Sequence, residues 1–498
     1  MAEVFSESLA YGSMKKRAVS ARSFRVKIPS SNSTSFVPEQ TIQIDLPGNL
    51  QGQYYNFNQM YLKMTVTSTA AYTLDRAGAL GFIRRLQIST AGAQLCDINN
   101  YNVLATAMMD TDASAEYKAG YGNVLLGTIG DALTGAQIGV GATTFCLPIV
   151  INCLAQTTPH RMIPSFSLSA IQMRLTLDSE VNAVKAAGAP GLSFTDVEMV
   201  CMMTELSPGA QSQIDAATGG KYNILAQSYM QSGATLAAGV GSLTANLGFS
   251  VSSLERIIAV HRPVDSVNVQ DRYSLGNRGT AGLAEFNYLI NSESYPARSI
   301  LVNSRGAESC AELLVADHSL VNFNKGSGFN NGFAGVLNQG YGQTSISGVD
   351  PSAAKAAAFM LVGATGSGTS AGSAAPAVAA GVILGTATGS NVGTFLASTE
   401  FESGLSDGKS ATIYSGISTI ASTVQWRGVY GAHAAAFDVD FFAQFTVLLS
   451  LDMRGSGVWS VSVWSGYALI FIFYIFTLKY KIESWNTLKA KKAIYIRW

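Results

Sequence analysis

The feature of this sequence that most constrains its fold is a series of short segments in which apolar and polar residues alternate. Residues 170–177 read AIQMRLTL, and every second position from Ile171 onward is a large apolar residue. Residues 41–49 and 60–67 alternate in the same way. A period of two places the apolar side chains of a strand on one face, whereas a helix needs a period near 3.6. The pattern therefore predicts antiparallel β-strands with one buried face, separated by turns.

The order of segments in the first half of the chain occurs again in the second half. Each half contains a hairpin pattern, then a short helix, then a Gly-rich loop, then closing strands. These segments are the hairpins at 82–98 and 286–301, the helices at 99–110 and 308–321, and the loops at about 119–143 and 325–405. Many short strands with few helices predict sheets packed face to face, so the chain should form two β-sandwiches in tandem.

Both helices carry a start signal in the sequence. Asn99 or Asn100 can cap the first helix. Ser309 and Glu312 have the spacing of a capping box at the start of the second helix.

Length and composition agree with an all-β chain of two domains. The 498 residues suffice for two domains of roughly 200 residues each. Only 13% of the residues are charged, and Lys plus Arg equals Asp plus Glu at 32 each. A surface with so little charge suits a subunit that is covered by its neighbours in an assembly. The polar, small and Gly-rich segment 207–221 is interpreted as the connection between the domains.

Residue types that carry chemistry are scattered. The five cysteines occur without CxxC spacing and in apolar runs, which is typical of buried thiols in a reducing compartment. The four histidines have no spacing that would form a metal site. GTSAG at 368–372 matches a nucleophile pattern, but its low-complexity surroundings lack the strand and helix that this pattern requires, so we interpret it as a chance match. The sequence therefore predicts no catalytic, cofactor-binding or metal-binding residues, and no enzyme.

Two groups of charged residues have structural interpretations. Arg84 and Arg85 are expected to pair at a domain or subunit contact. A second group is interpreted as carboxylates on the exposed face of strands: Asp438, Asp440 and Asp452.

Four stretches together resemble a known family. They are FIRRLQISTAGAQLCDINNYNVL, RMIPSFSLSAIQMRLTLDSEV, EFNYLINSESYPARSIL followed by AELLVADHSLV, and FDVDFFAQFTVLLSLDMRGSGVWSVSV. In this order and at this spacing they are similar to the double jelly-roll major capsid proteins of adenovirus-like viruses, tailless DNA phages, virophages and large DNA viruses of eukaryotes. The resemblance covers most of residues 36–463. The long loop at 325–405 and the residues after Val463 depart from the family pattern.

The resemblance implies two tandem eight-stranded antiparallel jelly-roll β-sandwiches with short helices and long Gly-rich loops. It also implies a homotrimer with a pseudo-hexameric outline that tiles an icosahedral shell around the genome, so the expected location is the virion, after synthesis inside the host cell. Expected partners are copies of the chain, neighbouring trimers and minor capsid or penton proteins. The expected divisions are an N-terminal arm (1–35), a first jelly roll (36–206), a linker (207–221), a second jelly roll (222–463) and a C-terminal tail (464–498).

The arm is predicted to be flexible and basic. Its six cations have no acidic residue among them: Lys15, Lys16, Arg17, Arg22, Arg25 and Lys27. Two interpretations stay open. The arm contacts the genome or an internal membrane on the inner side of the shell, or it holds neighbouring trimers together.

The C-terminal tail differs sharply from the rest of the chain. Residues 455–478 are uncharged and end in YALIFIFYIFTL, and a basic stretch follows. Once GVWSVSV is used as a strand, about 15 apolar residues remain, which is short for a span of roughly 20 residues. Three interpretations stay open: a tail that contacts a membrane, an ordered tail that holds a neighbour, or an extension absent from the natural product, such as translation past a stop codon at Trp464.

Two other classes of function make different predictions. A tandem β-sandwich that binds carbohydrate or a cell-surface ligand should show a signal peptide, disulfides and exposed aromatic platforms. The N-terminus has no apolar core typical of a signal peptide. A jelly-roll enzyme should show a cluster of His and carboxylate residues, which the spacing does not provide.

Overall fold

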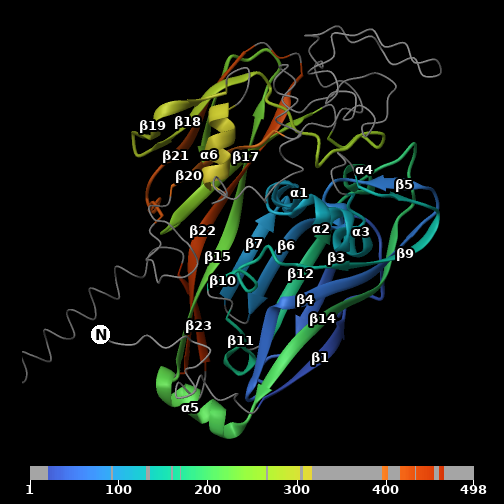
Figure 1. The fold of residues 1–498 in the computed structure, drawn as a ribbon, viewed down its shortest axis with the longest axis vertical. Coiled ribbons are helices and arrows are strands. Elements are labelled where there is room, and N and C mark those ends of the chain that lie inside the picture. Colours follow the sequence, from blue (N-terminus) through green and yellow to red (C-terminus); the bar gives the residue numbers. More distant parts are fainter. Residues whose placement is uncertain are drawn as a thin grey trace, which may run out of the picture.

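The computed structural model describes residues 21–90, 93–129, 135–158, 161–168, 170–264, 267–302, 307–316, 395–401, 416–431, 433, 435–453 and 459–464. In this part of the chain, antiparallel sheets form two sandwiches that lie side by side (Figure 1). The predicted all-β class and the arrangement as two tandem jelly rolls are confirmed.

The first jelly roll is formed by two main sheets and one small sheet. One main sheet contains β1 (Ala21–Pro29), β2 (Ser35–Phe36), β4 (Gln53–Ser68), β9 (Gly141–Leu147), β11 (Ile163–Pro164) and β14 (Ser193–Leu206). The other contains, in order, β3 (Thr41–Leu46), β12 (Ile171–Leu177), β6 (Ile83–Thr90) and β7 (Ala93–Asn99). The small sheet contains β13 (Val184–Lys185), β5 (Tyr72–Leu74) and β8 (Gln137–Ile138).

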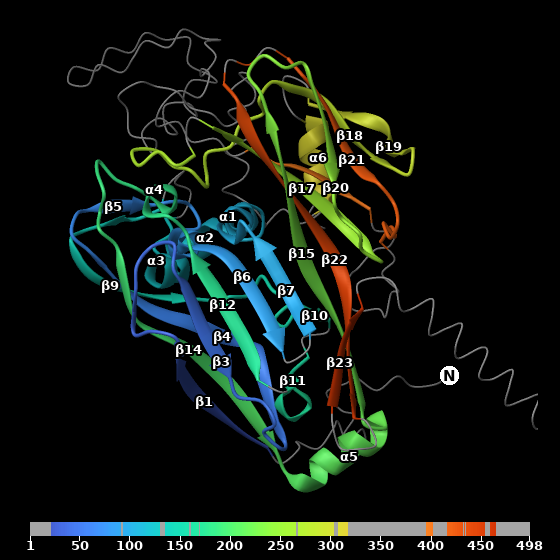
Figure 2. The same cartoon turned by 180° about the vertical axis from the view of Figure 1, so that it is seen from behind.

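The second jelly roll has one long sheet and one short sheet. The long sheet contains β10 (Thr157–Thr158), β15 (Lys221–Leu236), β22 (Phe437–Met453), β17 (Leu254–Pro263), β20 (Ala397–Glu400) and β23 (Trp459–Trp464). The short sheet contains β16 (Ser242–Leu247), β21 (Val424–Tyr430), β18 (Leu283–Ile290) and β19 (Glu293–Leu301). β15 and β22 pair over their full length and run along much of the long axis of the molecule (Figures 1 and 2).

Short helices occupy the connections. They are η2 (Gly78–Phe82), α1 (Tyr101–Thr111), α2 (Ala115–Ala119), α3 (Tyr121–Leu126), η3 (Ser165–Ser167), α4 (Glu180–Ala183), α5 (Pro208–Thr218) and α6 (Ala307–Ala316). Consequently the stretch at 119–143, expected as a loop, contains α3 and β8. The expected linker 207–221 is largely helical, because Pro208 starts α5 and Gly219 ends it in the left-handed conformation.

The apolar residues of the alternating segments are buried in the strands that these segments form. In β12 the apolar positions are buried, and the polar positions between them are half-buried or exposed. In the hairpin of β18 and β19, Phe286, Tyr288 and Ile290 are buried, and Asn291 and Ser292 form the turn with positive φ. Both observations confirm the predictions made from the pattern.

An aromatic cluster shows how the two sheets of the second sandwich pack. The ring of Phe286 stacks on Trp426 with a centroid distance of 4.9 Å. Trp426 also contacts Phe441 of the opposite sheet at 5.3 Å. The indole therefore fills the space between the two sheets, and the hairpin at 286–301 is part of the wall of the sandwich.

Several predicted boundaries are wrong. Residues 21–29 of the expected flexible arm form β1, which pairs with β14 along its whole length. Residues 397–400 of the expected loop form β20, which pairs with β17. β23 extends to Trp464, one residue into the expected tail. Residues 1–20 and 465–498, and most of the loop at 325–405, including GTSAG, lie outside the described residues.

The two helix starts also differ from the prediction. Asn100 is the N-cap residue of α1, but its side chain makes no capping hydrogen bond. α6 begins at Ala307, so Ser309 lies inside its first turn and does not precede the helix. The capping-box prediction at Ser309 and Glu312 is therefore wrong.

Candidate functional site: the seam between the jelly rolls

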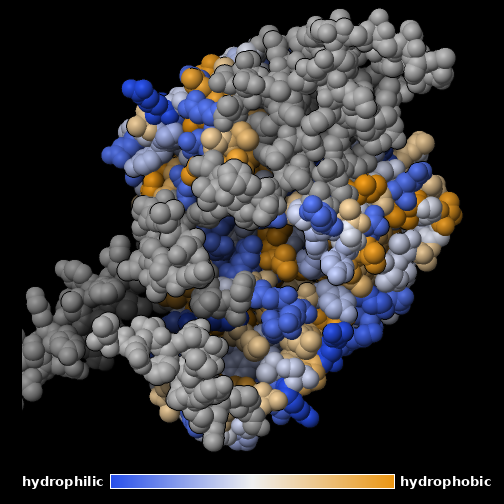
Figure 3. Space-filling model, in the orientation of Figure 1, coloured by the Kyte–Doolittle hydropathy of each residue, from blue (hydrophilic) through white to orange (hydrophobic). Residues whose placement is uncertain are grey.

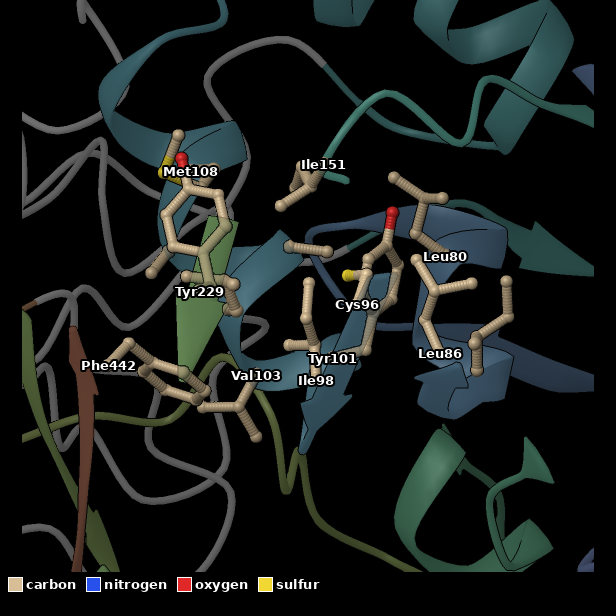
Figure 4. Packing of buried hydrophobic residues seen from close by; sticks show 14 of the residues in the cluster. Leu80, Leu86, Cys96, Ile98, Tyr101, Val103, Met108, Ile151, Tyr229 and Phe442 are labelled. Atoms are coloured by element: carbon tan, nitrogen blue, oxygen red, sulfur yellow. The ribbon is translucent and has the colours of Figure 1, made fainter. Parts of the chain in front are cut away.

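Helix α1 lies where the two jelly rolls meet, a contact region that we call the seam (Figures 1 and 2). Both polar and apolar residues of α1 are buried. Figure 4 shows Val103 and Met108 of α1 in the same buried cluster as Tyr229 of β15 and Phe442 of β22. The helix is therefore packed against the second jelly roll as well as its own.

The first polar group in the seam is centred on the carboxylate of Asp110, at the end of α1. Arg76 Nη1 lies 3.3 Å from one oxygen, and Lys118 Nζ lies 3.7 Å from the other. Arg278, from the second jelly roll, donates a hydrogen bond to the same carboxylate. All four side chains are buried. Burial by itself would raise the pKa of Asp110, but the three cations lower it to about 2. Burial lowers the pKa of Arg278 to about 10.

The adjacent residues Asp75 and Arg76 bind the backbone of the second jelly roll. Asp75 Oδ2 accepts hydrogen bonds from the amides of Leu275 at 3.0 Å and Gly276 at 2.9 Å. Arg76 donates to the Gly276 carbonyl. A Cβ atom at position 276 would collide with the Asp75 carboxylate, so this close approach requires glycine.

The second polar group is centred on Asp440 of β22. Arg262 donates to Oδ2 through Nη2 at 2.7 Å and through Nε at 3.1 Å. Oδ1 accepts from Asn100 at 2.8 Å and from Gln231 at 2.9 Å. Asn100 therefore binds the second jelly roll instead of capping its own helix. Asp440 is buried and paired, so our interpretation of it as an exposed carboxylate is wrong.

The third polar group joins β17 to the end of α1. Arg256 Nε donates to Gln444 at 2.6 Å, and its Nη2 lies 3.4 Å from the sulfur of Met108. The neighbouring Glu255 accepts from Gln444 and Gln227, both at 2.9 Å. Burial raises the pKa of Glu255. Three separate polar groups thus connect one helix to the second jelly roll.

Three of the six predicted basic residues lie on strand β1 and not on a free arm. Arg22 on β1 forms an ion pair with Glu205 of β14 at 2.6 Å, and Lys27 lies 3.8 Å from Glu198. Arg25 is exposed on the same strand. The acids that accompany these cations come from β14, which is distant in the sequence. The other three residues of the set lie outside the described residues: Lys15, Lys16 and Arg17.

Arg85 pairs with Asp97 across the hairpin of β6 and β7, at 2.8 and 2.7 Å. The expected pairing is therefore present, but it lies within one hairpin and does not join the two jelly rolls. Neighbouring Arg84 is exposed.

The described part of the chain contains no group of His, Cys, Asp and Glu side chains that would hold a metal ion. The imidazole of His261 lies in the aromatic core, 2.9 Å from the hydroxyl of Tyr430. Burial lowers the pKa of His261 to about 3. Among the described residues, no helix combines the length and apolar character needed to cross a membrane.

Comparison with known proteins identifies the fold. No protein-family model matches the sequence, and no curated protein matches it. A chain of the PBCV-1 virus capsid matches the structure with a TM-score of 0.54 at 11% identity, covering 91% of this chain and 99% of that chain. The Faustovirus major capsid protein matches with a TM-score of 0.54 at 9% identity, covering 88% and 92%. A chain of the Sputnik virophage matches with a TM-score of 0.50 at 10% identity, covering 94% of each. The chain has the fold of these capsid proteins, two jelly-roll sandwiches in tandem.

Proposed function

We propose that this chain is the major capsid protein of an icosahedral virus, and that it assembles as pseudo-hexameric homotrimers that tile the shell around the genome. The observation that carries the proposal is the fold: both jelly rolls, in order, correspond to capsid chains over about nine tenths of this chain. The proposed location is the virion.

The seam supports a role as a wall subunit. A trimer with a pseudo-hexameric outline needs two jelly rolls held at a constant angle. Here α1 is fixed to the second jelly roll by the groups around Asp110, Asp440 and Arg256. Ion pairs and hydrogen bonds restrict orientation more than apolar contact does, because their strength depends on direction.

The surface supports self-association. The large apolar residues Tyr121 and Val124 of α3 are each 79% exposed, and Val140 is 69% exposed. Figure 3 shows hydrophobic residues on the edge of the first jelly roll that carries α3 and β5. Interfaces are poor in charge at their centre, so a low-charge surface with exposed apolar residues favours contact with copies of the chain.

We assign no enzyme activity and no cofactor to the chain. Its proposed partners are itself, neighbouring trimers, and minor capsid or penton proteins. We propose that the basic residues of the N-terminus, which include Lys15, Lys16 and Arg17 before β1, make non-specific contact with the genome or an internal membrane.

Mass measurement in solution and negative-stain microscopy test the proposal. We expect particles, or trimers of about three times the 52.4 kDa chain mass. The double variant Tyr121→Asp, Val124→Asp should assemble less than wild type. The control Ala216→Asp, Ala217→Asp adds the same charge at exposed positions of α5 and should assemble as wild type does. A persistent monomer would contradict the proposal, and a monomer that binds glycans would favour a carbohydrate-binding tandem.

A further inference from the structure

Two of the five cysteines meet in the seam. Cys96 lies on β7, and Cys153 lies in the segment between β9 and β10. The sulfur of Cys153 lies 3.4 Å from the carbonyl oxygen of Leu95, the residue before Cys96, and within reach of an interaction with the Cys96 thiol. Both side chains are buried, at 3% and 0% exposure. No spacing rule predicts this pair, because the fold alone brings the two positions together.

The chain around Cys153 belongs to both jelly rolls. Asn152 holds the turn, since its amide donates to Ile149 and its oxygen accepts from the Leu154 amide at 2.9 Å. The segment then continues into β10, which pairs with β15 of the second jelly roll. On the other side of the pair, the Ser228 hydroxyl of β15 lies 4.0 Å from the sulfur of Cys96. A bond between the two sulfurs would therefore join β7 of the first jelly roll to a segment that is hydrogen-bonded into the second.

We propose that Cys96 and Cys153 form a redox site, which closes to an intrachain disulfide when the folded chain meets a low-molecular-weight disulfide such as oxidised glutathione. In the first step the thiolate of Cys96 attacks one sulfur of the small disulfide, whose S–S bond breaks and releases one small thiol. In the second step the thiolate of Cys153 attacks the Cys96 sulfur of the mixed disulfide and releases the second small thiol. The two cysteine protons end on the two released thiols, and the small disulfide is reduced as the pair is oxidised.

The environment favours this order. The hydrogen bond from Cys153 lowers the pKa of Cys96, so Cys96 is the first to become a thiolate. The interaction with Cys96, together with burial, raises the pKa of Cys153, so Cys153 keeps its proton until Cys96 has reacted. Burial raises the pKa of Cys201 on β14 to about 12, so this thiol stays protonated. β7 is the last strand in its sheet, so a local opening breaks its ladder with β6 and its packing against β15 while the other strands of the sheet stay paired. Such an opening admits the small disulfide to the buried pair.

The timing of this step rests on the proposed function. A subunit made in a reducing interior keeps both thiols, and a particle released into an oxidising medium would close them. The bond would then hold the two jelly rolls at their assembled angle outside the cell.

Thiol trapping tests the proposal on the full-length purified chain. The reduced, folded protein is incubated with oxidised glutathione, alkylated in denaturant, digested and analysed by mass spectrometry. We expect three of the five thiols to remain and one linked peptide pair to contain Cys96 and Cys153. Free thiols at both Cys96 and Cys153, a glutathione adduct that persists on either of them, or a different linked pair would overturn the proposal.

Variants and unfolding measurements complete the test. Cys96→Ser and Cys153→Ser should each abolish the linked pair, whereas Cys201→Ser, a matched buried thiol, should retain it. Oxidised wild-type protein should unfold at a higher temperature than the reduced protein. An unchanged unfolding midpoint would refute the claim that the disulfide holds the two jelly rolls together. Trimer or particle formation in the presence of reductant reports on the proposed function alone, so the two proposals can fail separately.

Discussion

Replacing Asp110 with asparagine is the most direct test of the seam. The substitution keeps the shape of the side chain but removes the negative charge that Arg76, Lys118 and Arg278 share. Three cations would then remain buried without their carboxylate. Because Arg278 comes from the second jelly roll, the loss acts on the contact between the domains and not only on α1.

The size of the effect follows from two estimates. A carboxyl group whose pKa is held at about 2 instead of 3.8 contributes about 2 kcal/mol to stability at neutral pH. Leaving buried charges uncompensated costs about 3–5 kcal/mol. For domains of this size, a loss in this range lowers the unfolding midpoint by roughly 5–20 °C. Since the pKa is lowered in the folded state, the contribution is present above pH 3.8 and disappears as the pH falls through about 2.

Calorimetry and urea unfolding at several pH values measure this effect. Asp110→Asn should be destabilised at pH 7, and its difference from wild type should shrink below about pH 4. Glu116→Gln removes an exposed carboxylate from the neighbouring helix and should change stability by less than about 0.5 kcal/mol. The double variant Asp110→Asn, Arg278→Met should lose less free energy of unfolding than the sum of the two single variants, because each single variant already removes the same ion pair. If Asp110→Asn unfolds like Glu116→Gln, the seam cluster does not stabilise the chain.

Three further variants test other parts of the structure. His261 has a pKa lowered to about 3 by burial, so stability should fall by about 2 kcal/mol between pH 6.5 and pH 5. His261→Gln should remove that slope in equilibrium unfolding, while His433→Gln, near the surface, should keep it. Gly276→Ala should lower the free energy of unfolding by more than about 2 kcal/mol, measured in urea, because its methyl group would displace the Asp75 carboxylate. Removing residues 465–498 leaves β23 complete and tests the interpretations of the tail; unchanged trimers and particles would exclude a tail that holds a neighbour.

Local patterns carried most of the fold prediction. The period of two in β12, and the hairpin of β18 and β19 with its two-residue turn, depend on residues close together in the sequence. Their physical cause is local too, since alternate side chains of a strand point to opposite faces. The repeated order of hairpin, helix and strands then indicated two sandwiches without any repeat in the letters.

The failures involve partners that are distant in the sequence. Arg22 was assigned to a free arm because Glu205, its partner, lies on a strand more than a hundred residues away. Asn100 is a good capping residue by type, yet its amide donates to Asp440, which no local signal indicates. The proximity of Cys96 and Cys153 had the same origin. Periodicity specifies which face of a strand is buried, but not which residue of another domain meets it.

The position of the buried charges suggests why the seam is polar at all. Apart from Asp178, every buried Asp, Glu, Lys or Arg in the described residues belongs to one of the polar groups around α1 and its contacts with the second jelly roll. Inside each sandwich the buried side chains are mostly apolar, and apolar contacts tolerate small changes in angle. A buried ion pair adds little stability over apolar packing, but it becomes costly when its geometry is disturbed. The chain thus places its angle-sensitive contacts where a change of angle between the jelly rolls would alter the outline of a trimer.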